Sequence, residues 1–198
     1  MPLEIEFKYK VRHVVAIEKD LVRLKAKRYG AKKQRDLYFN HPSKNFAETG
    51  EAFRLRLDDD TPKITYKGPR LPSVAKVRQE IEISLARPEK NGKGRASLYD
   101  TMKSLLLLLG FRPVGEVAKE RKVFRIKRGA YQIEIACDKV RGLGSFVELE
   151  IVTSERQREA AVEVLSKLAG ELKLIHHEKR SYLTMLLQKA GHIPSFAV

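Results

Sequence analysis

The sequence Leu3-Glu4-Ile5-Glu6-Phe7-Lys8-Tyr9 decides the fold, because its residues alternate strictly between apolar and ionised. Successive side chains of an extended strand point to opposite faces, so one face here is apolar and the other carries Glu4, Glu6 and Lys8. The segment therefore predicts a strand, which we place at Met1–Arg12, with a charged face that must meet either solvent or a ligand.

Similar alternation recurs along the rest of the chain. We predict further strands at Lys33–Asn40, Ala52–Asp58, Lys63–Lys67, Val77–Ser84, Arg112–Val117, Lys119–Lys127, Tyr131–Asp138 and Phe146–Val152. Apolar spacing of helical period predicts helices at Ala16–Arg28, Ser97–Leu109, Glu155–Leu172 and Ser181–Ala190, with Gly30 and Gly110 as stops after the first two. The segment Ala86–Ser97, rich in Pro, Gly and Lys, predicts a loop. We expect an α+β fold with a single domain over residues 1–198.

Two arrangements fit strands that have one apolar and one ionised face. The common one is an antiparallel sheet whose charged face meets solvent. Against it, the charged faces hold few neutral polar residues, and acids such as Glu80 and Glu82 are segregated from bases such as Arg54 and Arg56. The other arrangement is a barrel of about eight strands, with amphipathic helices over an apolar exterior and the charged faces lining an interior that has room for a ligand.

A charged barrel interior must hold compensating ions, because unpaired buried charge is costly. Paired carboxylates favour a hard divalent cation such as Mg²⁺ or Mn²⁺, and clustered Lys and Arg favour phosphate oxygens. A metal-bound polyphosphate satisfies both groups of residues. The composition agrees, because 40 Lys and Arg against 25 Asp and Glu give a net charge of +15, which attracts polyanions.

The composition also excludes other classes of protein. The single Cys137 rules out an internal disulfide framework and a multi-cysteine metal site. The longest apolar run, Leu105–Leu109, is too short to span a bilayer, and the charged N-terminal segment is unlike a signal peptide. We therefore expect a cytoplasmic protein with no membrane partner.

A series of short motifs carries a more specific signal. In chain order they are Glu4-Ile5-Glu6-Phe7-Lys8, of the form ExExK, Asp36-Leu37-Tyr38-Phe39, Phe53-Arg54-Leu55-Arg56, Thr65-Tyr66-Lys67-Gly68-Pro69, Arg78 with Glu80 and Glu82, Lys119 with Arg121, Asp138–Glu150 with its Gly142-Leu143-Gly144, and Arg180-Ser181-Tyr182. In this order the motifs resemble the CYTH superfamily, also called triphosphate tunnel metalloenzymes, over nearly the whole chain. The last motif resembles class IV adenylate cyclases.

The resemblance implies an eight-stranded antiparallel tunnel around a site that depends on a divalent metal. It implies metal ligands at Glu4, Glu6, Glu148 and Glu150, and triphosphate-binding bases at Lys8, Arg54, Arg56, Lys67, Arg78, Lys119 and Arg121. The candidate catalytic residues are Lys8, Arg121 and Asp138. Asp138, Glu80 and Glu82 are also candidates for supporting the site from behind or for holding a second metal, and Glu134 is a further candidate for a supporting role. Tyr182 is interpreted as a packing residue.

Three functions share such a site. A class IV adenylate cyclase-like enzyme converts ATP to cyclic AMP and pyrophosphate, and a triphosphatase hydrolyses inorganic triphosphate, thiamine triphosphate or a nucleotide. The third is a non-catalytic polyphosphate or nucleic-acid binder, which the clustered carboxylates disfavour because they repel nucleic-acid phosphates. We predict the cyclase-like enzyme first and the triphosphatase as the alternative. ATP or inorganic triphosphate is the expected partner, and a homodimer is allowed for.

Overall fold

The computed structural model describes residues 3–85 and 95–191. Its strands are β1 (Leu3–Val11), β2 (Lys27–Asn40), β3 (Ala52–Asp58), β4 (Thr61–Lys67), β5 (Lys76–Ser84), β6 (Arg112–Arg128), β7 (Tyr131–Val140) and β8 (Gly144–Thr153). Its α-helices are α1 (Val14–Arg23), α2 (Phe46–Thr49), α3 (Arg95–Leu108), α4 (Arg158–Glu171) and α5 (Tyr182–Lys189).

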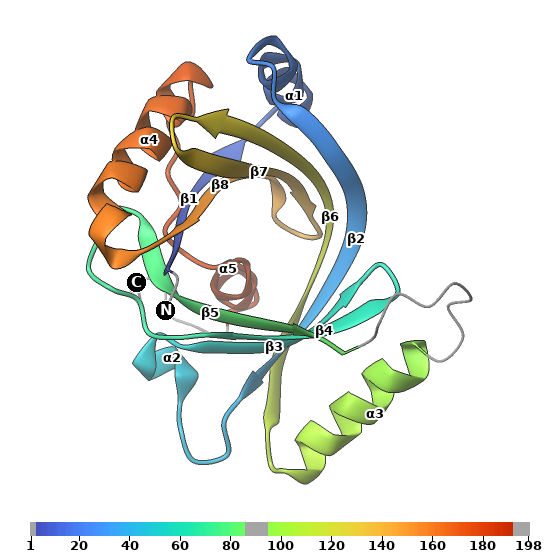
Figure 1. Ribbon diagram of the computed structural model, residues 1–198. Coiled ribbons are helices and arrows are strands. Elements are labelled where there is room, and N and C mark those ends of the chain that lie inside the picture. The colour runs from blue at the N-terminus through green and yellow to red at the C-terminus, as the bar shows by residue number, and fades with distance from the viewer. Residues whose placement is uncertain (1–2, 86–94, 192–198) are drawn as a thin grey trace.

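The strands form one closed antiparallel barrel in the order β1-β5-β4-β3-β2-β6-β7-β8, and β8 pairs back onto β1. Figure 1 shows this ring with α3 and α4 outside it and α5 within its outline. The prediction of an α+β fold built on an eight-stranded antiparallel barrel is therefore confirmed. No helix in the described part of the chain is long and apolar enough to cross a membrane.

Helices cover the apolar outer faces of the strands. Ile5 and Leu149 lie in a buried cluster with Leu165 of α4, and α4 packs against β1 and β8. On another side of the barrel, Leu55 lies in a second cluster with Leu106 of α3. Complete burial of one such side chain stabilises a fold by about 1.5–3 kcal/mol, so the apolar faces turn outward toward helices and leave the ionised faces inside.

The predicted helix at Ala16–Arg28 is wrong in its C-terminal part. Helix α1 ends at Arg23, and Lys25 turns the chain with a φ of 62° before β2 begins. Gly30 is not a helix stop, because it lies inside β2 where the pairing with β6 shifts register. The turn is made by a lysine in the left-handed region, so neither glycine nor proline marks it in the sequence.

Other boundaries also differ from prediction. The two strands expected between Arg112 and Lys127 are one continuous strand, β6. Helix α3 begins at Arg95, earlier than the predicted start at Ser97, and the remainder of the predicted loop, 86–94, lies outside the described residues. The helix expected over Glu155–Leu172 begins with a 3₁₀ turn, after which α4 starts at Arg158.

The segment before α5 completes the pairing of β1. Strand β5 pairs with only the N-terminal part of β1, and residues 176–180, which we call the strap, lie beside the remainder. The amide of Lys10 donates to the carbonyl of His176 at 3.0 Å, and the amide of Glu178 donates to the carbonyl of Lys8 at 2.7 Å. The strap leads directly into α5 and so fixes that helix at one end of the barrel.

Candidate functional site

The barrel encloses a cavity of about 910 Å³. The residues predicted to bind metal, to bind triphosphate or to support the site all line it: Glu4, Glu6, Lys8, Arg54, Arg56, Lys67, Arg78, Glu80, Glu82, Lys119, Arg121, Glu134, Glu148 and Glu150. Asp138 is the exception among the predicted residues, because it is fully buried behind the wall of the cavity. Charged side chains that alternate along seven strands therefore face one common interior.

One wall of the cavity consists of Arg54 and Arg56 on β3 and Lys119 and Arg121 on β6, and we call it the basic wall. Its guanidinium groups are held by aspartates. Nε and Nη2 of Arg56 donate to the two oxygens of Asp36 at 2.6 and 2.8 Å, and Arg54 lies 3.6 Å from the same carboxylate. Burial opposes charge on Asp36, but the two arginines outweigh it and hold the pKa of Asp36 well below its ordinary value. A bidentate pair fixes orientation as well as charge.

Asp138 holds the β6 part of the basic wall in the same way. It accepts from Nε and Nη2 of Arg121 at 2.7 and 2.6 Å, from Nζ of Lys119 at 3.3 Å and from the hydroxyl of Tyr182 at 3.0 Å. Burial opposes its charge, yet Arg121 and Lys119 lower the pKa of Asp138 below its ordinary value. Its carboxylate thus accepts hydrogen bonds from three residues, and it can therefore orient the two bases, Lys119 and Arg121, that face the cavity.

The opposite wall, formed by Glu4 and Glu6 on β1 and by Glu148 and Glu150 on β8, is called the carboxylate wall. Its partners are mainly ammonium groups. Nζ of Lys67 donates to both oxygens of Glu4 at 2.8 and 2.7 Å and also contacts Glu80. Nζ of Lys76 donates to Glu6 at 2.6 Å. An ammonium is a compact point charge on a flexible stem, so these pairs lack the fixed orientation of a guanidinium fork.

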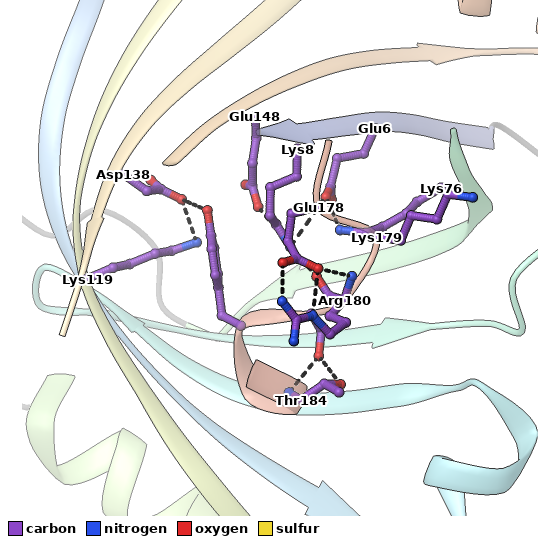
Figure 2. Close-up of polar contacts among 12 residues, drawn as sticks. Glu6, Lys8, Lys76, Lys119, Asp138, Glu148, Glu178, Lys179, Arg180 and Thr184 are labelled. Atoms are coloured by element: carbon purple, nitrogen blue, oxygen red, sulfur yellow. Dashed lines mark hydrogen bonds and ion pairs between the residues drawn. The ribbon is translucent and has the colours of Figure 1, made fainter. Parts of the chain in front are cut away.

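Lys8 lies at the centre of the site and is only 2 % exposed. Its ammonium is 3.8 Å from Glu6 and 3.7 Å from Glu148, and Glu148 also contacts Arg121 of the basic wall. Nζ of Lys8 donates to the carbonyl of Arg180 in the strap at 2.9 Å. Figure 2 shows Glu6, Lys8 and Glu148 side by side, with Arg180 beyond them toward α5. Lys8 thus connects the two walls to the end of the barrel that α5 closes.

Glu150 differs from the other carboxylates of its wall. It makes no hydrogen bond or ion pair with another residue in the described ranges, and the strand register sets it opposite Glu6 on β1 and Glu134 on β7. Burial, followed by the negative charge of Glu4, raises the pKa of Glu150 well above its ordinary value. Lys67 attracts Glu150 but forms no ion pair with it in the described ranges, so this carboxylate beside other carboxylates is a position that a bound cation would stabilise.

The carboxylate wall has the chemistry of a site for a hard divalent cation, because such ions take carboxylate oxygens as ligands. Within residues 3–85 and 95–191, however, no three Asp, Glu, His or Cys side chains form a group that could hold a metal ion directly. Glu4 and Glu6 hold ammonium groups at 2.8 Å or less, whereas Glu150 has no such partner. The ligand types therefore fit a metal, but two of the carboxylates are engaged by lysines.

Lys76, Asp36 and Tyr182 were not assigned to the site from the sequence. Lys76 was missed because the strand was expected to start at Val77, although Lys76 has the same alternation phase as Arg78. Burial lowers the pKa of Lys76 to about 7 against the attraction of Glu6. Asp36 was noted in a motif but given no role, and no local pattern identifies it as the partner of Arg56.

Tyr182 does more than the packing expected of it. Its ring packs against Phe146 with centroids 5.0 Å apart, and its hydroxyl donates to Asp138. The ammonium groups of Lys8 and Lys119 lie 4.2 and 5.0 Å from the centroid of the ring. One aromatic side chain thus contacts bases from two strands, a role that depends on α5 entering the barrel and has no signature in the sequence.

Proteins with a similar sequence or structure cover nearly the whole of this chain. A protein of Methanocaldococcus jannaschii that is provisionally named an adenylate cyclase is 31% identical over 186 residues, which are 92% of this chain and 98% of that protein. The solved structure of the PH1819 protein from Pyrococcus horikoshii is 33% identical with a TM-score of 0.78, covering 94% of this chain and 99% of the other. At 18% identity, a Hippeastrum structure shares the fold with a TM-score of 0.64 and 98% coverage of both chains. That protein was provisionally an adenylyl cyclase, and its structure is described as revealing a dominant triphosphatase activity.

The family model of the CYTH domain matches residues 2–182, which is most of the chain. This match agrees with the closed antiparallel barrel and with the ionised residues that line it. The resemblance drawn from the motifs is thereby confirmed, and the chain belongs to the CYTH family of divalent-metal-dependent enzymes that act on triphosphate substrates.

Proposed function

We propose that this protein binds ATP in the barrel and converts it to cyclic AMP and pyrophosphate. The triphosphate lies against the basic wall with Lys8, Lys67 and Arg78. The residues that would hold Mg²⁺ or Mn²⁺ are Glu4, Glu6, Glu148 and Glu150, and the bound ion would supply charge neutralisation at the phosphate oxygens.

The observation that carries this proposal is the difference between the two ends of the cavity. Near α2 and α5 the lining holds a group of uncharged side chains, Phe46, Leu183, Leu187 and Thr184, with the ionised Glu51 and Arg180 at its border. The other end is lined by ionised residues such as Lys63. Organic groups bind in apolar niches with a few polar side chains. An uncharged niche beside a triphosphate site supports a substrate that carries an organic group, such as the adenosine of ATP.

Cyclisation requires the ribose 3′-oxygen to attack the α-phosphorus while pyrophosphate leaves. Positioning of the reacting atoms supplies much of the rate enhancement in such a reaction. Here the bases hold the phosphates, and the niche between α2 and α5 would hold the adenosine so that the 3′-hydroxyl faces the α-phosphorus. We assign Lys8 and Arg121 to contacts with the transferred phosphate and Asp138 to orienting Arg121 and Lys119 from behind.

A product analysis tests the proposed function. Purified protein is given ATP or inorganic triphosphate with Mg²⁺ or Mn²⁺, and cyclic AMP, pyrophosphate and orthophosphate are measured. We expect cyclic AMP and pyrophosphate in equal amounts from ATP. ADP with orthophosphate, and faster cleavage of inorganic triphosphate, would overturn the cyclase assignment.

A pair of leucines on α5 tests the niche itself. Leu187 lines the cavity, whereas the adjacent Leu186 packs at the barrel end near Phe146 and Gly142 and does not line it. We expect Leu187→Gln to raise the KM for ATP about 5–10-fold, a loss of about 1–1.4 kcal/mol, without changing the affinity for inorganic triphosphate. Leu186→Gln is the matched control and should leave the ratio of the two affinities unchanged. Equal losses for ATP and inorganic triphosphate in Leu187→Gln would contradict a role for the niche.

The alternative function is hydrolysis of a triphosphate. The dominant triphosphatase activity described for the Hippeastrum protein favours it, since the same barrel then performs hydrolysis in another member of this fold. In that case water takes the place of the 3′-hydroxyl, and the product analysis above gives orthophosphate.

Two further expectations, a cytoplasmic location and a homodimer, stay predictions. Light scattering of the purified protein tests whether it is a homodimer.

A further inference from the structure

The pair formed by Lys76 and Glu6 sets a condition on metal binding. Nζ of Lys76 donates to Oε1 of Glu6 at 2.6 Å, and the two residues are 7 % and 8 % exposed. The strand register places them opposite each other on β5 and β1. Removing one partner of a buried ion pair is strongly unfavourable, because the other charge stays buried without compensation.

A metal ion that binds Glu6 therefore competes with Lys76 for the charge of this carboxylate. The released ammonium then needs a new anion. The neighbouring carboxylates Glu148 and Glu150 do not provide one, since Glu148 is already shared between Lys8 and Arg121, and Glu150 belongs to the proposed metal site. Lys76 itself lines the cavity. A phosphate oxygen of the substrate is the anion that reaches this position.

From this geometry we propose that Lys76 is an exchangeable counter-ion, which holds Glu6 in the metal-free barrel and turns to a phosphate oxygen when the metal takes Glu6. The inference rests on the proposed binding of metal and triphosphate, and it is the same for a cyclase and for a triphosphatase. Figure 2 shows Glu6 and Lys8 on the same strand, so a carboxylate proposed to bind metal lies beside a base proposed to bind phosphate.

The exchange makes the binding of metal and triphosphate cooperative. Metal alone must leave the Lys76 ammonium without a partner, and triphosphate alone must attract an ammonium that Glu6 already holds. When both are present, neither charge is left uncompensated. By linkage, each ligand then raises the affinity for the other by the same factor, in addition to any direct contact between them.

Two binding measurements on Lys76→Met test the exchange without any turnover. In the first, Mn²⁺ binding without triphosphate is followed by the loss of the electron paramagnetic resonance signal of the free ion. We expect an affinity about tenfold or more above wild type, because the competing ammonium is gone. In the second, calorimetry measures a non-hydrolysable triphosphate analogue with EDTA and again with saturating Mn²⁺, and we expect the variant to bind it about fivefold more weakly than wild type only when Mn²⁺ is present.

The matched control is Lys63→Met, which removes an ammonium from the same cavity at 3.0 Å from Glu82 and 3.1 Å from Asp58, away from Glu6. It measures the general effect of one positive charge, and we expect less than about a threefold change in Mn²⁺ affinity. An equal gain in both variants, or unchanged or weaker Mn²⁺ binding in Lys76→Met, would overturn the proposal. Tighter Mn²⁺ binding with unchanged binding of the triphosphate analogue in the presence of Mn²⁺ would also overturn it, since Lys76 would then not pass to the phosphate.

A second variant keeps the charge and so avoids a buried unpaired carboxylate. Lys76→Arg offers Glu6 a guanidinium, which binds a carboxylate through two parallel hydrogen bonds and is harder to displace. We expect Mn²⁺ to bind several-fold more weakly than in wild type. An affinity equal to that of wild type or above it would contradict the exchange, even if Lys76→Met does not fold.

Discussion

The two walls of the cavity carry opposite charges, and they are also held in different ways. On the basic wall, Arg56 and Arg121 are each bound bidentately by a buried aspartate, Asp36 or Asp138, from a neighbouring strand. On the carboxylate wall, Glu4 and Glu6 hold lysine ammonium groups, Glu148 is shared between Lys8 and Arg121, and Glu150 makes no hydrogen bond or ion pair within the described residues. The guanidinium groups are fixed before any substrate arrives, whereas the carboxylates hold partners that can leave.

This difference separates two tasks of the site. Groups that recognise phosphate geometry gain from being oriented in advance, because less order is lost on binding. Groups that must accept a metal ion gain from a weakly oriented partner that can be displaced. The structure therefore suggests that substitutions on the basic wall act mainly on stability and geometry, and that those on the carboxylate wall act mainly on ion binding.

The largest effect is expected at Asp138, which is 0 % exposed and accepts from three side chains. Asp138→Ala removes the acceptor of Lys119 and Tyr182 and leaves Arg121 with Glu148 alone, and we expect it to lower the free energy of unfolding by about 3–5 kcal/mol. Urea unfolding followed by circular dichroism measures this. Asp20→Ala, at an exposed pair with Arg23 on α1, should cost less than about 1 kcal/mol. A similar cost in the two variants would refute the fixed basic wall.

The next effect compares the two kinds of partner directly. Arg56→Lys replaces a bidentate guanidinium by a point charge, and we expect a loss of about 1–3 kcal/mol of stability as Asp36 keeps only part of its hydrogen bonding. The reverse exchange on the other wall, Lys67→Arg, should change stability by less than about 1 kcal/mol. Chemical denaturation of both variants with EDTA present provides the measurement. If Lys67→Arg is the more damaging of the two, the comparison between the walls is wrong.

The smallest effect is expected at Glu150 and depends on pH. The pKa of Glu150 is raised in the folded state above the ordinary 4.5, so its protonated form contributes stability that is complete below pH 4.5 and is lost as pH rises toward the folded pKa. In EDTA, wild type should therefore lose stability over that rise, whereas Glu150→Gln should not. At pH 7 we expect Glu150→Gln to melt about 2–4 °C higher, the shift given by about 1 kcal/mol in a domain of this size. The variant should also bind Mn²⁺ more weakly. A lower melting temperature in EDTA would contradict the uncompensated charge of Glu150.

Much of the fold could be predicted because period-two alternation is a strong signal in strands such as Leu3–Tyr9 and Tyr131–Asp138. The same alternation identified the residues of both walls, because the charged faces of the strands all point into one interior. It failed at the start of β2, where Leu24 and Ala26 pack on the core around a turn made by Lys25 and extend the helical spacing. Periodicity reports which face is buried and does not report where the backbone changes direction.

The partners within the site could not be predicted in the same way. Asp36 meets Arg56 through the register of β2 on β3, and Tyr182 meets Asp138 only because α5 enters the end of the barrel. These contacts join residues far apart in the sequence and depend on closure of the sheet. The sequence indicated which charges line the interior, and the three-dimensional register decides which of them neutralise one another.

The closure of the barrel has a consequence for how the chain is made. Strand β1 leaves the ribosome well before its partner β8, which sets Lys8 opposite Glu148, and the strap is synthesised later still. Until then β1 has open edges, and pairings between such distant segments form slowly. A nascent or truncated chain that ends before β8 would expose an edge that pairs readily with other chains, so aggregation during synthesis should depend on how soon β8 and the strap become available.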